Sequence, residues 1–173
     1  ASLVGSEMCK ETAFIIISFC EELVKWLFTY VICWKDKNFN YVYDAIVYCV
    51  FISLGFASIE NLIAILSNSG GFTLALQRGL ITVPAHAFFG IISGYYLGLA
   101  KKYEARRWNK RKRKYIILSL LIPIIVHGMF DSLLFLSSTA SLLFATALIV
   151  YLYLSSALKV VKTSSEAKKI TRR

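Results

Sequence analysis

Ionisable side chains lie inside stretches of this chain that are otherwise apolar enough to cross a bilayer. Both histidines and five of the ten acidic residues fall in these stretches: Glu21, Glu22, Asp44, Glu60, Asp131, His86 and His127. A charged side chain at the centre of a membrane helix costs roughly 3 kcal/mol. Carboxylates and imidazoles can act as general bases, proton carriers or metal ligands. Their retention at this cost indicates a catalytic site, a proton or ion path, or a ligand pocket.

The elements that must position these groups are long apolar segments. Five of them, each about 20 residues or more, are expected to be helical spans: 13–34, 42–66, 77–100, 115–137 and 139–158. The polar residues 68–71 are typical of a turn. With 57% hydrophobic and only 17% charged residues, the chain is too apolar for an ordinary soluble domain. We therefore predict a single domain over residues 1–173, an all-α, polytopic transmembrane helical bundle.

The net charge of +10 is concentrated in a few segments. Residues 101–114 are expected to form a basic loop and residues 159–173 a basic tail, and Lys35 and Lys37 fall in the first loop. Five spans place these segments on one side, which the positive-inside rule makes cytoplasmic. The N-terminus then faces outward, and because the sequence begins at Ala1 rather than Met, a further segment upstream is compatible with this topology. No basic face is interleaved with aromatic residues, which argues against nucleic acid as a partner.

The position of each polar group along its span predicts its depth. Counting at 1.5 Å per residue puts the following side chains ~9–15 Å below the outer surface: Glu21, Glu22, Glu60, His86, His127 and Asp131. Four helices thus deliver ionisable groups to one layer. Asp44 differs, because it lies near the cytoplasmic end of its span, and we expect it to be an interfacial cap or a structural partner.

Helical periodicity predicts which of these groups face one another. Lys25 is one turn from both Glu21 and Glu22 and can neutralise either. Phe56 shares a face with Glu60, and His127 shares a face with Asp131. His86 begins a stripe at four-residue spacing that continues through Gly90, Gly94 and Gly98. Small residues let neighbouring helices approach, so this stripe is expected to face the bundle interior.

The ordered set of motifs resembles the PrsW family of intramembrane proteases, relatives of the CAAX-prenyl protease and bacteriocin-processing group of glutamic proteases. The resemblance rests on Glu21-Glu22-x-x-Lys25, Phe56-x-x-x-Glu60-Asn61, Arg78 followed by His86, and His127-x-x-x-Asp131. It covers about Phe19 to Asp131. It implies hydrolysis of a single-pass membrane protein, such as an anti-sigma factor, near its extracytoplasmic side in a bacterial cell membrane.

The resemblance and the side-chain chemistry together give a set of site residues. The expected catalytic residues are Glu21, Glu22, Glu60, His86, His127 and Asp131, supported by Lys25, Phe56, Asn61 and Arg78. Amide hydrolysis needs a base for water, a stabiliser for the oxyanion and an acid for the leaving amine. We assign Glu21 as the base, with Glu22 bridging to Lys25. Glu60 or His86 would position the water, and His127, oriented by Asp131, would stabilise the oxyanion or protonate the leaving nitrogen.

Other interpretations of the same residues stay open at this point. No cofactor is expected, but Glu21, Glu60, His86 and His127 could surround a zinc ion, although the motif HExxH is absent. A proton-coupled carrier or a substrate-binding scaffold could use the same carboxylates, although no internal repeat is visible. A network that only holds the helices together is the fourth possibility.

Overall fold

The computed structural model describes residues 2–67, 71–136, 138–165 and 170, with side chains from residue 16 onward. Over these ranges the chain forms helices and no strand: α1 (Ser2–Cys33), α2 (Val42–Ser67), α3 (Gly71–Ala105), α4 (Asn109–Leu136) and α5 (Thr139–Ser165). The predicted all-α helical bundle is confirmed. The expected turn at 68–71, apart from Gly71, and the tail beyond Ser165, apart from Ile170, lie outside the described residues.

Helices α3, α4 and α5 extend past the predicted spans at their basic ends. Only residues 106–108 separate α3 from α4, so most of the basic segment 101–114 is helical rather than the expected loop. Lysine and arginine have high helix propensity, and their long side chains reach water from a helix that leaves the apolar layer. Arg107, with φ of 58°, adopts the left-handed conformation that often ends a helix.

The surface of the bundle is apolar. Helices α2 to α5 are each long and apolar enough to cross a membrane. Helix α1 is not among these candidate spans, and its stretch from residue 13 contains the charged residues Glu21, Glu22 and Lys25. Large apolar side chains point outward, with Phe51 and Leu66 exposed by 72% and 77%, whereas Glu22 and Lys25 are each only 3% exposed. A protein with this distribution is an integral membrane protein.

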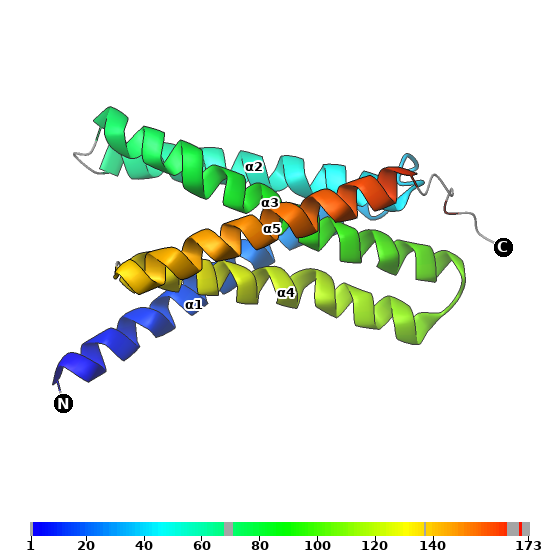
Figure 1. The fold of residues 1–173 in the computed structure, drawn as a ribbon. Helices are drawn as coiled ribbons and strands as arrows, with labels where there is room; N and C mark the ends of the chain where they lie inside the picture. The colour runs from blue at the N-terminus through cyan, green and yellow to red at the C-terminus, as the bar shows by residue number, and fades with distance from the viewer. Residues whose placement is uncertain (1, 68–70, 137, 166–169, 171–173) are drawn as a thin grey trace.

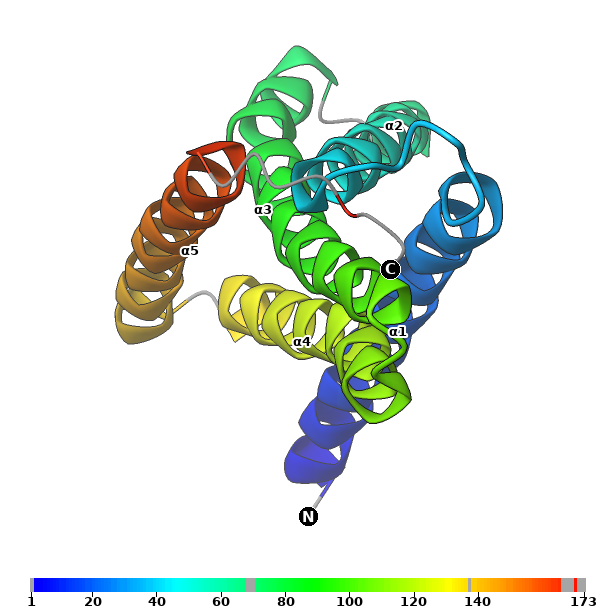
Figure 2. The same cartoon turned by 90° about the vertical axis from the view of Figure 1, so that its right-hand side faces the viewer.

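Helix α3 lies at the centre of the bundle, with α2, α4 and α5 packed around it (Figure 2). Helix α1 packs against α2 and α4. The α1–α2 connection, the α3–α4 connection and the end of α5 lie at one end of the molecule, and the chain N-terminus lies at the other (Figure 1). The described parts of the basic segments therefore share one end, as the charge distribution predicts (Figure 1).

Glycines allow α2 and α3 to approach closely. A Cβ atom at Gly94 would lie 2.5 Å from Ile46 Cα, and one at Gly98 would lie 2.6 Å from the Val42 carbonyl oxygen. Real Cβ atoms do not approach backbone atoms this closely, so the helix contact requires glycine. The stripe that contains these glycines also contains His86, which is 3% exposed. The predicted inward direction of the stripe is confirmed.

Asp44 caps the start of α2. Its Oδ2 atom accepts hydrogen bonds from the backbone N–H groups of Asn40 and Tyr41, both at 2.8 Å. An acidic residue in the first turn also interacts favourably with the helix dipole. The expected cap is confirmed, and it accounts for this carboxylate without a functional role.

Candidate active site

The ionisable side chains of four helices converge in the interior. His86 on α3 and His127 on α4 are each 3% exposed, and their ring centroids lie 5.0 Å apart. Glu21 and Glu22 reach them from α1, and Glu60 from α2. The single polar layer expected from the span positions is therefore a contiguous cluster, although the side of the membrane on which it lies stays a prediction.

Lys25 is the buried centre of this cluster. Its Nζ atom lies 2.7 Å from Glu22 Oε1 and 3.5 Å from Glu21 Oε2. The same ammonium lies 2.8 Å from His86 Nδ1 and 4.6 Å from the centroid of the Phe56 ring. A buried lysine requires such pairing, because an unpaired charge in a medium of low polarity is costly. Lys25 therefore connects the acidic pair of α1 to the histidine of α3.

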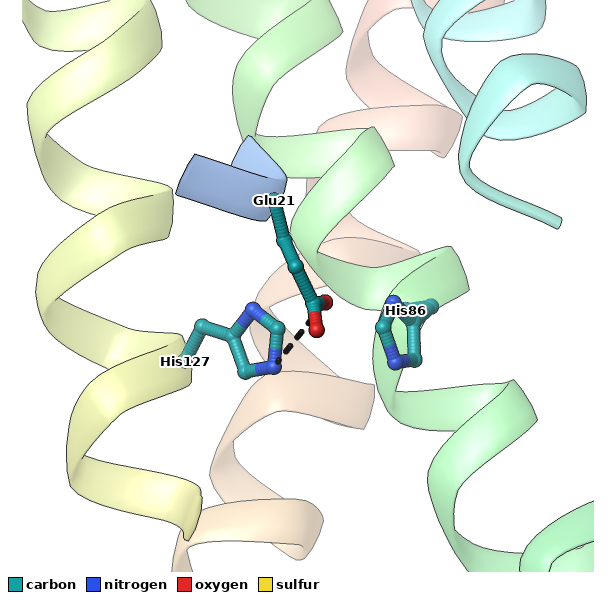
Figure 3. A group of neighbouring side chains, drawn as sticks. All are labelled: Glu21, His86 and His127. Atoms are coloured by element: carbon teal, nitrogen blue, oxygen red, sulfur yellow. Dashed lines mark ion pairs between the residues drawn. The ribbon is translucent and has the colours of Figure 1, made fainter. Parts of the chain in front are cut away.

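The two adjacent glutamates have different surroundings. Glu22 Oε1 is 2.9 Å from His127 Nδ1 as well as close to Lys25, so its carboxylate is held between two side chains. The Glu21 side chain is 16% exposed, and its Oε2 atom is 3.9 Å from His127 Nε2. Figure 3 shows the Glu21 carboxylate pointing between the imidazole rings of His86 and His127. Glu22 is therefore placed to position its neighbours, and Glu21 is placed to meet a water molecule.

His127 is oriented from several directions. Its Nε2 atom lies 3.3 Å from Asp131 Oδ2, one turn further along α4. The Phe89 ring stacks on the imidazole with a centroid separation of 4.7 Å, and Ser18 donates a hydrogen bond to Asp131 Oδ2 at 3.5 Å. Sequence reasoning missed Phe89 and Ser18. The spacing of three residues between His86 and Phe89 was the available signal, because residues three apart share a helix face.

Glu60 joins His86 to Arg78. Its Oε2 atom lies 3.3 Å from His86 Nε2, and its Oε1 atom accepts a hydrogen bond from Arg78 Nη2. Both expected residues are thus part of the cluster. Asn61 is not, because its buried Oδ1 atom has no hydrogen-bond partner among the described residues and it does not line the adjacent pocket.

A pocket of about 360 Å³ opens onto the cluster. Its lining comes from α1, α2, α3 and α4 and consists of Ile17, Glu21, Glu60, Arg78, Thr82, His86, His127, Asp131, Leu134 and Phe135. Five of the six expected catalytic residues line it, whereas Glu22 lies behind it with Lys25. The pocket is in the half of the bundle away from the basic segments, since Glu60 is near the end of α2 and Arg78 near the start of α3. A carboxylate and two imidazoles are groups that can act as a general base, a general acid and a hydrogen-bond donor.

Residues 6–158 match the sequence model of a family described as "PrsW family intramembrane metalloprotease". The chain belongs to the PrsW family. The resemblance carried by the four motifs is thereby confirmed. Similar curated proteins carry the name Protease PrsW. The one from Halalkalibacterium halodurans is 43% identical over 126 residues, which cover 73% of this chain and 55% of the relative. The one from Clostridioides difficile is 33% identical over 160 residues, covering 91% and 66%.

A third PrsW relative, from Bacillus subtilis, is 36% identical over 122 residues, covering 70% of this chain and 53% of the relative. The chain therefore spans between about half and two thirds of the length of these curated PrsW proteins. No solved structure matches the chain.

The description of the PrsW family raises the question of whether these residues fit a metal ion. Glu21, His86 and His127 each offer a ligand atom within 4.8 Å of the others, and a glutamate with two histidines is a known catalytic zinc set. A ligating imidazole nitrogen must present a lone pair. His86 Nδ1 lies 2.8 Å from Lys25 Nζ. When the lysine donates to Nδ1 as an ammonium, which has only donors, the ring proton is on Nε2. In that tautomer His86 has no lone pair left for an ion, and the arrangement does not fit a zinc site.

Proposed function

We propose that this PrsW-family protein is an intramembrane endopeptidase in which a glutamate activates the attacking water. The observation that carries the proposal is the position of Glu21, a pocket-lining carboxylate that points between two histidines from different helices. A carboxylate surrounded by low-polarity protein is a better base than one in water. We also propose that no metal ion is required, because the donor pattern at His86 leaves no lone pair for one.

The side chains suffice for a complete hydrolytic cycle. Glu21 takes a proton from water as the oxygen attacks the carbonyl carbon, which gives a tetrahedral intermediate with a negatively charged oxygen. N–H donors at the pocket stabilise that oxygen. His127 gives its Nε2 proton to the leaving nitrogen, the C–N bond breaks, and a carboxyl and an amine product result. Glu21 then returns its proton to His127 Nε2, which lies 3.9 Å from Glu21 Oε2.

The proposed substrate is a single-pass membrane protein that reaches the pocket from the bilayer, such as an anti-sigma factor. Three features support this class. The outer surface of the bundle is apolar, the pocket lies between helices rather than in a soluble domain, and it is in the half away from the basic segments. If those segments are cytoplasmic, as the positive-inside rule predicts, cleavage falls near the extracytoplasmic side of the substrate. The anti-sigma factor itself is proposed from the resemblance of the motifs.

Co-expression with candidate single-pass membrane proteins tests the proposal. Wild-type protein should shorten the substrate, and Glu21→Gln should leave it intact while still inserting into membranes. Asp44→Asn is a matched control, because it changes a carboxylate to an amide outside the pocket. Cleavage by the Glu21 variant at near-normal rate would remove this residue as the base. Proton uptake into proteoliposomes without any proteolysis would replace the protease by a proton-coupled carrier.

A further inference from the structure

We propose that Lys25 fixes the tautomer of His86, which makes this histidine a permanent hydrogen-bond donor to the pocket, whereas His127 is the proton carrier of the pair. This division of roles rests on the proposed peptide hydrolysis. It assigns Lys25 as a positioning residue that acts on the reaction through His86.

The contact with Lys25 determines the position of the ring proton of His86. Lys25 Nζ lies 2.8 Å from Nδ1, and an ammonium can only donate, so Nδ1 must accept. The proton is then on Nε2, which faces Glu60 Oε2 at 3.3 Å, an atom that can only accept. The tautomer therefore rests on the Lys25 contact, because Glu60 Oε2 has no hydrogen-bond partner among the described residues and is only near enough to accept from Nε2 after a small movement. His86 cannot take up a second proton at Nδ1 unless it loses its contact with Lys25.

The neighbours of His127 differ in kind. Its Nδ1 faces Glu22 Oε1 at 2.9 Å, and its Nε2 faces Asp131 Oδ2 at 3.3 Å and Glu21 Oε2 at 3.9 Å. Every one of these partners is a carboxylate oxygen, so an N–H group on either ring nitrogen has an acceptor. His127 can therefore hold a proton on both nitrogens and release the one on Nε2.

The two rings thus meet the reacting peptide in different ways. The contact from His86 Nε2 to Glu60 is long, and both groups line the pocket, so a substrate carbonyl oxygen there can accept a hydrogen bond from the Nε2 N–H group. A donor fixed before the reaction stabilises the developing oxyanion without reorganisation. Proton delivery to the leaving nitrogen requires a group that gains and loses protons, which His127 can do and His86 cannot.

Amide replacements separate these roles. A glutamine at a histidine position can place its amide nitrogen near the position of Nε2, whereas an asparagine places its nitrogen near Nδ1. Neither amide can act as a general acid, because it donates hydrogen bonds but does not titrate near neutral pH. We expect His86→Gln to stay within about tenfold of the wild-type kcat, and His86→Asn and His86→Ala to lose ~10²–10³. His127→Gln should lose at least ~10² in kcat, because a general acid is absent.

Two variants, Lys25→Arg and Lys25→Met, test the role of Lys25. The position of the His86 ring proton is measured directly, so this test does not depend on activity. In ¹⁵N spectra of histidine-labelled protein in detergent, we expect the His86 proton on Nε2 in wild type and in Lys25→Arg, whose guanidinium also only donates. Lys25→Met should allow a mixture of tautomers and lower kcat with little change in KM.

Several results would overturn the inference. If the ring proton of His86 in the wild-type protein is found on Nδ1, the inference is wrong, and this result needs no known substrate. Equal loss of activity in His86→Gln and His86→Asn, or full activity in His127→Gln, would overturn it at the level of the reaction. Failure of the proposed function would give different results in the cleavage assay. Wild-type protein would leave every substrate intact, or the Glu21→Gln variant would cleave the substrate.

Discussion

Glu22 Oε1 lies 2.9 Å from His127 Nδ1, although the two residues are 105 positions apart in the sequence. The same oxygen is 2.7 Å from Lys25 Nζ. One buried carboxylate thereby contacts both His127 of α4 and Lys25 of α1. The neighbouring carboxylate, Glu21, is left to face the pocket.

The first prediction is that the two adjacent glutamates differ in what they support. Glu22→Gln leaves Lys25 in the interior with one carboxylate at 3.5 Å, and breaking a buried ion pair costs ~3–5 kcal/mol. We expect a clearly lower midpoint of thermal unfolding in detergent for this variant. Glu21→Gln should unfold near the wild-type temperature yet lack activity. Equal thermal stability of both variants would contradict the assignment of Glu22 as the structural partner.

The second prediction concerns the contact between α2 and α3. Gly94→Ala should destabilise the protein by ~1–3 kcal/mol, because the added methyl group would collide with the backbone of Ile46. Gly55→Ala is the matched control, since a Cβ there meets nothing within 4 Å and alanine favours a helix. Thermal unfolding of both variants provides the measurement. A Gly94 variant as stable as the Gly55 variant would show that the helices pack less closely than described.

A third prediction addresses the ion pair between Glu60 and Arg78. Glu60→Gln and Arg78→Gln each leave one charged partner in a pocket with apolar walls, so each should be destabilising. The double variant should lose less than the sum of the two, with a coupling of ~0.5–3 kcal/mol for residues in direct contact. Unfolding of the four proteins in the cycle gives this value. Additive losses would mean that the pair does not interact in the folded protein.

The fourth prediction is that cleavage does not depend on a metal ion. Purified protein that cleaves a tethered substrate should keep its rate, within about twofold, after dialysis against EDTA and in the presence of 1,10-phenanthroline. The physical reason is that His86 accepts a hydrogen bond at Nδ1 and carries its proton on Nε2. Loss of cleavage that returns when zinc is added would refute both this prediction and the tautomer assigned to His86.

The sequence predicted the helical bundle and the buried cluster for one physical reason. Charged groups within apolar spans must face protein, and groups at equal depth on neighbouring helices then meet. The stripe from His86 to Gly98 indicated which face of α3 points inward. The position of Asp44 near the end of its span indicated that it caps a helix. These inferences need only the periodicity of an α-helix and the length of each apolar span.

Other features depend on how the helices pack against one another, which helical periodicity alone does not specify. Adjacent helical residues point about 100° apart, so either Glu21 or Glu22 could have faced the pocket. The contact between Lys25 and His86 joins residues 61 apart and depends on how α1 is rotated against α3. The end of α3 at Ala105 and the start of α4 at Asn109 were not predicted, because basic residues continue both helices beyond the apolar layer.

The acidic and basic side chains of α1 also bear on how the protein is made. As α1 leaves the ribosome, Glu22 and Lys25 can pair within one turn, but His86 and His127 belong to helices synthesised later. Each charge that enters lipid without its final partners costs roughly 3 kcal/mol at the bilayer centre. The buried charges of α1 therefore gain their remaining partners only when α3 and α4 have entered the membrane.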